Sequence, residues 1–225
     1  MVFKNKNLEY YSEEKVLNPL PHVLEELNFI FKFLPKKKNL KLVDFGAGGG
    51  RVTIPLLKKG HQVLAVDIDK NALRKLIKTA KKIKKEKYLK IKSSLPKKEK
   101  YDVILGADVL HHIDIKKYFP YFYNHLKKEG KIIFSEPNVF NFSWIIFISL
   151  FLNWFEEKGI FQINYFYLIH QLKKSGFKKI KIFGLYFFPP MIFGKNNFFQ
   201  KINLFLGNLP LLKLFAFRYI VIAER

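Results

Sequence analysis

Short apolar segments alternate along the chain with longer segments in which apolar residues recur every three or four positions. Strand-like segments occupy 40–45, 62–66, 88–92, 103–107 and 131–135, and helical periodicity fills 51–59, 71–85 and 115–126. Near-continuous apolar strands separated by helices are typical of a parallel sheet that is covered on both faces. The pattern therefore predicts a doubly wound α/β fold.

Both ends of the chain depart from this alternation. A helix is expected at 21–33, before the first strand. After Asn138 the chain becomes strongly aromatic, and we expect a helix at 144–155, a charged break at 156–159, a helix at 164–175 with Asn164 as its N-cap, and strands at 178–183 and 219–223. A Phe- and Pro-rich insertion, 184–217, separates these last two strands.

The segment LVDFGAGGGRVT, residues 42–53, leads from a strand into a helix through four glycines. Glycines at such a turn let the backbone approach a ligand and direct amide N–H groups toward it. The dinucleotide fingerprint fails at its third glycine, where Arg51 stands, and the Lys-Ser/Thr ending of a phosphate-binding loop is missing. What remains is an acid, Asp44, followed by alternate glycines at Gly46, Gly48 and Gly50.

Further segments follow in a fixed order: VLAVDID at 63–69, YDVILGADVLHHI at 101–113, LKKEGKIIFSEPN at 126–138 and KKSGFKKIKI at 173–182. Together with the glycine segment they resemble the class I S-adenosylmethionine-dependent methyltransferases of the small-molecule and lipid type. The resemblance implies a seven-stranded, mostly parallel Rossmann-like sheet with an apolar insertion before the last strand. It also implies one domain, 1–225, with an N-terminal helical lid (1–38), a cofactor-binding core (39–138) and an aromatic-rich substrate or lid region (139–225).

The resemblance further implies a binding site for S-adenosylmethionine. Its expected residues lie at strand ends: Asp44, Gly46, Ala47, Gly48, Asp67, Ile68, Ser93, Ser94, Ala107 and Asp108. Asp44 would act beside the cofactor's amino group, Asp67 would accept hydrogen bonds from the ribose hydroxyls, and Ile68 would lie on the adenine. Ser93 or Ser94 stands where the family usually has an Asp for the adenine amino group, which weakens the expected adenine contacts.

Two histidines are the candidates for catalysis. His111 and His112 leave the carboxyl edge of the sheet, where ligands bind in open α/β folds. An imidazole suits a general base because its pKa lies near neutrality, although either ring could instead cap a helix or pack structurally. Without cysteine there is no thiolate zinc site, and we expect no metal.

The formal charge of +23 comes from lysine, since only four arginines occur. AT-rich codon usage explains such a composition, and so does attraction to an anionic membrane surface. The scarcity of arginine disfavours sequence-specific nucleic-acid binding, for which its forked side chain is suited. The N-terminal MVFKNKNLEYYSEE shows no signal pattern, so we expect a cytoplasmic protein, peripheral on the inner face of the membrane if it binds one.

The apolar segment Trp144–Phe155 is too short to span a bilayer, because 12 helical residues extend only about 18 Å. Three interpretations remain: an interfacial helix with Trp144 and Trp154 at headgroup level, a substrate pocket or lid, and an oligomer contact.

We therefore expect methyl transfer to a small or lipid-like acceptor, such as a quinone precursor, isoprenoid or glycolipid. One alternative is a tRNA or rRNA methyltransferase, which the positive charge favours and the absence of an Asn-Pro-Pro-Tyr-like motif disfavours. Another is a basic membrane-binding module without catalysis.

Overall fold

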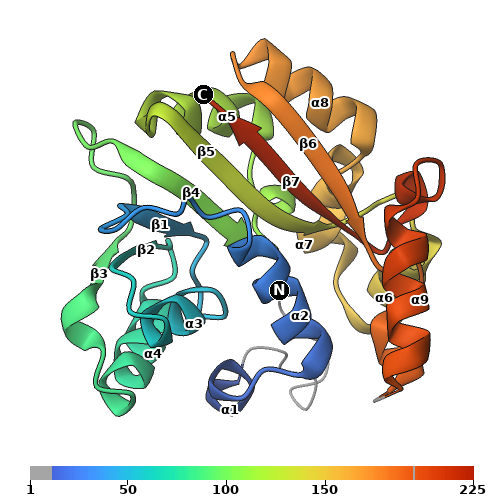
Figure 1. Ribbon diagram of the computed structural model, residues 1–225, viewed down its shortest axis with the longest axis horizontal. Helices are drawn as coiled ribbons and strands as arrows, with labels where there is room; N and C mark the ends of the chain where they lie inside the picture. Colours follow the sequence, from blue (N-terminus) through green and yellow to red (C-terminus); the bar gives the residue numbers. More distant parts are fainter. Residues whose placement is uncertain (1–11, 195) are drawn as a thin grey trace.

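A seven-stranded sheet with the order β3-β2-β1-β4-β5-β7-β6 forms the centre of the molecule (Figure 1). The computed structural model describes residues 12–194 and 196–225. The strands are β1 (Leu42–Phe45), β2 (Val63–Val66), β3 (Leu89–Lys92), β4 (Tyr101–Ala107), β5 (Leu126–Pro137), β6 (Lys178–Leu185) and β7 (Arg218–Glu224). Strands β1 to β5 are parallel, and β7 runs antiparallel to both β5 and β6. The doubly wound, mostly parallel sheet expected from the sequence is confirmed.

Helices cover both faces of this sheet and enclose two apolar cores. One face carries α1 (Glu13–Leu17), α2 (Pro21–Phe31), α3 (Thr53–Lys58), α4 (Lys70–Lys82) and α6 (Phe142–Phe151), and the other carries α5 (Ile115–His125) and α8 (Tyr165–Lys174). Successive residues of β4 show the alternation, because Val103 and Leu105 pack into the first core and Ile104 into the second.

Shorter elements complete the chain. They are α7 (Trp154–Glu157) and the 3₁₀ segments Glu86–Tyr88, Leu110–His112, Lys158–Gln162, Pro190–Phe193 and Leu212–Phe215, and a longer helix, α9 (Asn197–Asn208), lies in the insertion before β7. Several helices begin where a side-chain oxygen caps them: Asp69 accepts the N–H groups of Asn71 and Ala72, and Asn164 accepts that of Tyr167. The N-cap expected at Asn164 is thereby confirmed.

The helix expected at 144–155 is wrong as a single element. Helix α6 ends at Phe151, and Asn153 accepts the Phe155 N–H to start α7. The expected charged break is helical instead, and its Glu157 is buried. Trp144 also does not lie at headgroup level, because it is only 8% exposed and donates its ring N–H to the Phe217 carbonyl at 2.6 Å.

The insertion between β6 and β7 folds back against α6. Asn203 of α9 accepts the backbone N–H groups of Phe187 and Phe188, which ties α9 to the segment after β6. The Asn141 side chain, at the N-terminus of α6, donates to the carbonyls of Phe187 and Phe215. Helices α6 and α9 are thus linked through the same segment after β6, at one end of the sheet (Figure 1).

The N-terminal helix α2 is part of the packed structure. Leu27 and Ile30 are fully buried in the first core, beside residues of β1, β4 and β5. Residues 1–11 of the expected N-terminal lid lie outside the described part of the chain, and a lid function for 12–38 stays a prediction.

Candidate functional site

A cavity of about 1060 Å³ opens at the carboxyl edge of the sheet, where β1, β2 and β4 end. All ten residues expected to bind the cofactor line it, and so does His112. His111 does not line the cavity. Ligands of open α/β sheets bind at this edge, so the position agrees with the general rule.

The glycine turn after β1 serves both packing and access. Gly46 has φ +73°, and a Cβ there would lie 2.3 Å from a methyl carbon of Val109. Gly48 has φ +48°, yet a Cβ there would meet no atom within 4 Å among the described residues. Gly46 is therefore required by the fold, whereas Gly48 leaves backbone exposed to the cavity.

Asp44, near the end of strand β1, is buried next to this glycine turn. Its Oδ2 accepts a hydrogen bond from the Thr53 hydroxyl at 2.6 Å. Its Oδ1 is buried with no hydrogen-bond partner among the described residues. Burial raises the pKa of Asp44 to about 7, and the Thr53 hydrogen bond only partly offsets this. A ligand cation that approached Oδ1 would restore the ionised form.

Asp67 follows β2 and is held by two backbone donors. Its Oδ2 accepts the Gly48 N–H at 2.7 Å, and its Oδ1 accepts the Asp69 N–H at 2.8 Å. Each carboxylate oxygen can accept a further hydrogen bond, so two ligand hydroxyls can be accommodated. Ile68 is 88% exposed beside it on the cavity wall, an apolar surface that a flat ring could cover.

Asp108, directly after β4, adopts a left-handed backbone conformation with φ +57°. Its carboxylate forms ion pairs with both Arg51 and Arg218. Both arginines also pair with Glu26 of α2. Of the three residues that join Asp108 in this cluster, only Arg51 could be found from the sequence, because it directly follows the glycine turn. Glu26 and Arg218 are separated by nearly the whole chain, and the sequence reading missed both.

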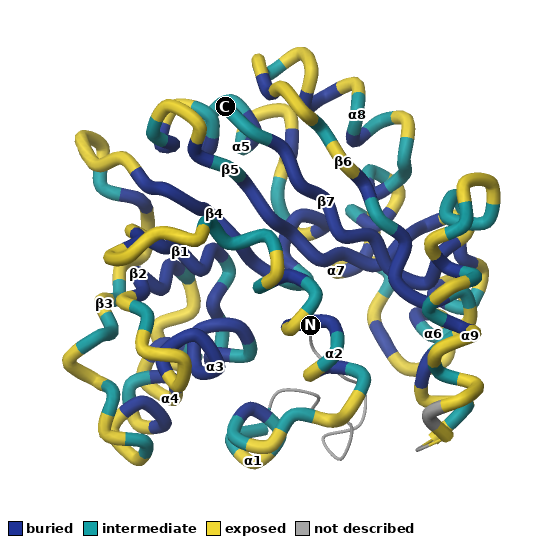
Figure 2. Tube along the Cα trace, viewed as in Figure 1, coloured by how far each residue is buried: buried dark blue, intermediate teal, exposed yellow. Residues whose placement is uncertain are grey.

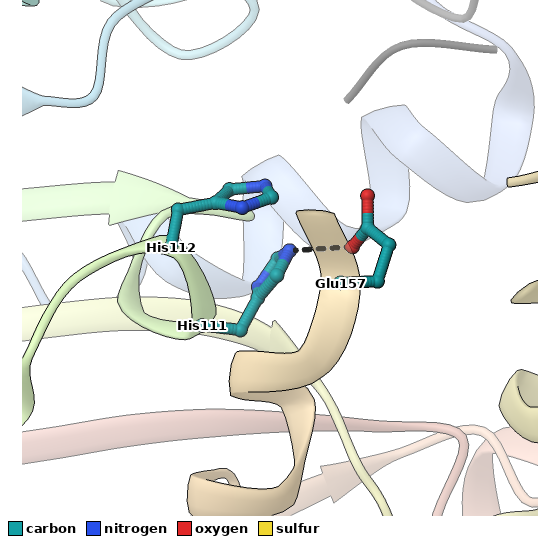
Figure 3. Close-up of side chains that lie close together, drawn as sticks. All are labelled: His111, His112 and Glu157. Carbon is teal, nitrogen blue, oxygen red and sulfur yellow. Dashed lines mark ion pairs between the residues drawn. The ribbon is translucent and has the colours of Figure 1, made fainter. Parts of the chain in front are cut away.

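His111 lies between two carboxylates, those of Glu136 and Glu157, and Figure 3 shows the second of them. Its Nδ1 lies 2.6 Å from Glu136 Oε2 and its Nε2 lies 3.3 Å from Glu157 Oε2, with the three side chains at most 3% exposed. Burial alone would lower the pKa of His111, but the hydrogen bond to Glu136 and the ion pair with Glu157 outweigh it and raise that pKa to about 9. His111 is thus protonated at neutral pH and cannot accept a proton there.

His112 has the opposite character. Its ring centroid lies 4.0 Å from that of His111, and it faces the cavity. Partial desolvation by the surrounding atoms and the positive charge of His111 both lower the pKa of His112. It is therefore neutral at pH 7 and able to accept a proton, which His111 is not.

One cluster in the described part of the chain brings possible metal donors together. Donor atoms of His111, His112 and Glu157 lie within 4.8 Å of one another. A protonated His111 offers no lone pair to a metal, and its charge already balances a carboxylate. The cluster is an ion-paired group, and the absence of a metal stays our prediction.

A family model described as "Methyltransferase domain" matches residues 20–182. The chain belongs to this family, and its sheet and cavity define it as a class I S-adenosylmethionine-dependent methyltransferase.

Particular relatives give the comparison more detail. The chain is 28% identical over 139 residues to the ubiquinone biosynthesis O-methyltransferase of Rickettsia canadensis, covering 58% of this chain and 56% of that one. It spans about half the length of such relatives. A methyltransferase structure from Archaeoglobus fulgidus matches with a TM-score of 0.66 at 15% identity, over 95% of both chains. Phosphoethanolamine N-methyltransferase 2 of Haemonchus contortus, solved with S-adenosylmethionine, gives 0.65 at 18% identity, over 97% of this chain and 58% of that one.

The residues of the cavity fit S-adenosylmethionine. The cofactor carries an ammonium group, two ribose hydroxyls and an adenine ring but no phosphate. Among the described residues, Asp44 has an oxygen with no partner that could accept from the ammonium, and Asp67 has lone pairs left for the hydroxyls. Gly48 leaves space for the part of the cofactor between these groups.

Proposed function

We propose that the protein transfers a methyl group from S-adenosylmethionine to a hydroxyl of a small, lipid-like acceptor. The observation that carries the proposal is that His112 lines the same cavity as Gly48 and Asp67, and its lowered pKa leaves it neutral at pH 7. The relatives named ubiquinone biosynthesis O-methyltransferase support a lipid-like acceptor and transfer to oxygen.

The reaction depends mainly on the orientation of the acceptor relative to the cofactor. S-adenosylmethionine, when bound, supplies a methyl group already activated by its sulfonium. Asp44, Gly48 and Asp67 would hold and orient the cofactor, so that positioning supplies most of the rate enhancement. A hydroxyl is a weak nucleophile, and His112 would take its proton as the new bond forms. The charge of His111 keeps His112 neutral and ready for this role.

Peripheral contact with an anionic membrane is the second part of the proposal. Eighteen exposed large apolar side chains lie between Phe140 and Phe215, against three elsewhere in the described chain. Helix α6 is apolar on both sides, since Trp144 and Ile148 are buried while Phe142, Ile146 and Leu150 face outward. A helix at the surface of a water-soluble domain normally turns a polar face outward.

Helix α9 repeats this arrangement. Phe198, Ile202 and Phe205 are exposed, and Figure 2 shows exposed positions along the helix. No charged residue occurs from 138 to 155, and 186–217 contains three lysines and no acid. Such a surface suits an anionic interface, which lysines approach favourably. In the described residues no helix has the length and apolar character needed to cross a bilayer.

A methyl-transfer assay with a lipid extract tests the catalytic role. We expect His112→Ala to lower the turnover number by about 10²- to 10⁴-fold, the usual contribution of a general base, with cofactor affinity unchanged. His170→Ala, at an exposed position of α8, is the matched control. Full activity in the His112→Ala protein would exclude His112 as the base.

Vesicle sedimentation tests the membrane contact. We expect binding to anionic vesicles at low salt, partial loss at high salt because the attraction is screened, and further loss when Phe142 and Ile146 are replaced by Ser. Leu20→Ser, an exposed apolar position before α2, is the control. A wild-type protein that stays in the supernatant with anionic vesicles at low salt would contradict the contact. A dimer in light scattering would then assign the surface to subunit association.

A further inference from the structure

Four charged side chains from distant segments meet beside the cavity, and two of them line it. Glu26 comes from α2, Arg51 from the glycine turn, Asp108 from the end of β4 and Arg218 from the start of β7. Their side chains are only 3 to 11% exposed. We call these four residues the charge ring.

The ring is closed and electrically balanced. Arg51 pairs with Glu26 and with Asp108, and Arg218 pairs with the same two carboxylates, its Nε lying 3.3 Å from Glu26 Oε1. Two guanidinium groups thus face two carboxylates away from water. Removal of one member would leave an unbalanced charge in a poorly solvated place, which is far more costly than removal of an opposite pair.

The ring has a cavity side and a core side. Arg51 and Asp108 line the cavity, whereas Glu26 and Arg218 do not. Arg218 also donates to the hydroxyl of Ser135 at 3.1 Å and to its carbonyl at 3.2 Å, while the Asp108 N–H donates to that same carbonyl at 3.0 Å. Asp108 is therefore held in its left-handed conformation by a strand end that Arg218 fixes.

We propose that Glu26 and Arg218 are positioning residues for cofactor binding. They hold Arg51 and Asp108 in place at the cavity wall, so that cofactor affinity depends on the docking of helix α2. The inference rests on the cofactor site assigned above. Neither residue touches the cavity, so each acts through its partner in the ring.

Because α2 also has apolar contacts with the core, an effect of Glu26 on cofactor binding can be distinguished from an effect on folding. Leu27 and Ile30 bury the helix in the core independently of the ring, and Phe29 packs against Phe183 with ring centroids 5.6 Å apart. A change from Glu26 to Gln keeps the side-chain shape and removes only the charge. Helix α2 should then stay docked while Arg51 and Asp108 lose their fixed positions.

Titration calorimetry with S-adenosylmethionine tests the proposal on the intact chain. We expect Glu26→Gln to weaken binding at least tenfold and to raise KM for the cofactor more than it lowers kcat. Glu25→Gln is the matched control, because Glu25 is the adjacent residue of α2, pairs with the Tyr186 hydroxyl and stands outside the ring. Its affinity should stay within twofold of the wild type.

A double variant supplies the second readout. Glu26→Gln combined with Arg218→Gln leaves the neutral Arg51–Asp108 pair, so it should bind more tightly than the product of the two single effects predicts. Unchanged affinity in folded Glu26→Gln, or effects that simply multiply, would overturn the inference. A lower melting temperature with normal affinity would also overturn it, since the ring would then be purely structural. If the wild type itself bound no S-adenosylmethionine, the cofactor site and not the ring would be at fault.

Discussion

Asp44 should make cofactor binding depend on pH. The perturbation is a shift from pH 7 to pH 6, with Asp44→Asn as the variant that cannot titrate. Burial raises the pKa of Asp44 to about 7 in the protein without ligand. The ammonium group of the cofactor would bind the ionised form, so the population of that form before binding sets the affinity.

The size of the effect follows from this pKa. With a pKa of about 7, roughly a tenth of Asp44 is ionised at pH 6 and about half at pH 7. Affinity should therefore fall about fivefold between pH 7 and pH 6, and binding at pH 6 should release about 0.9 proton. The amino group of the cofactor stays largely protonated in this range, so it adds little.

Calorimetry in two buffers of different ionisation enthalpy measures the protons released. Equal affinity at pH 6 and pH 7, or the same pH dependence in Asp44→Asn, would refute the reasoning.

The thermal stability of the unliganded protein gives a second check on the pKa of Asp44. A carboxyl whose pKa is raised by folding stabilises the protein below its unfolded pKa of 3.8, and this stabilisation is lost as the pH rises to about 7. Asp44→Asn should thus melt at a higher temperature than the wild type at pH 8.

Three further changes have expected outcomes. Gly48→Val should abolish cofactor binding in calorimetry because its branched side chain would enter the cavity, whereas Gly194→Val, at φ +53° and also in open space, should bind normally. Asp67→Ala should weaken binding by about 10- to 100-fold, since charge-assisted hydrogen bonds contribute about 1.5–3 kcal/mol, and an unchanged affinity would remove Asp67 from the site. Glu157→Gln should lower the pKa of His111, which stands at about 9, in an NMR titration. The stabilisation that protonated His111 gives below pH 6.5 would then be lost at a lower pH than in the wild type, and an unmoved titration would contradict the pairing.

The local parts of the site could be predicted from the sequence. Strand β1, its glycine turn and the acid after β2 are adjacent in the chain, and parallel strands bring their carboxyl ends to one edge. Asp69, and not Asp67, caps helix α4, so the Asp67 carboxylate remains available for a ligand. These features depend on residues that are close in sequence and on a sheet topology that the alternation of strand-like and helical segments is enough to predict.

Long-range pairings could not be predicted in this way. Glu157 belongs to a short charged stretch that reads as a surface break, yet His111 lies 46 positions earlier in the chain and buries it. Trp144 faces inward because Phe217, from the far end of the chain, offers a ring at 4.7 Å and a carbonyl acceptor. Periodicity cannot show such partners, because helix α6 is equally apolar on both sides.

The most direct test of the proposed function is the destination of a labelled methyl group. The wild type is incubated with methyl-labelled S-adenosylmethionine and separate fractions of cellular lipid, water-soluble metabolites and RNA, with Gly48→Val as the blank. We expect label in the lipid fraction that depends on the wild-type cavity and forms an ether bond to oxygen. Label found only in RNA, or equal in wild type and Gly48→Val, would contradict methyl transfer to a lipid-like acceptor from this site.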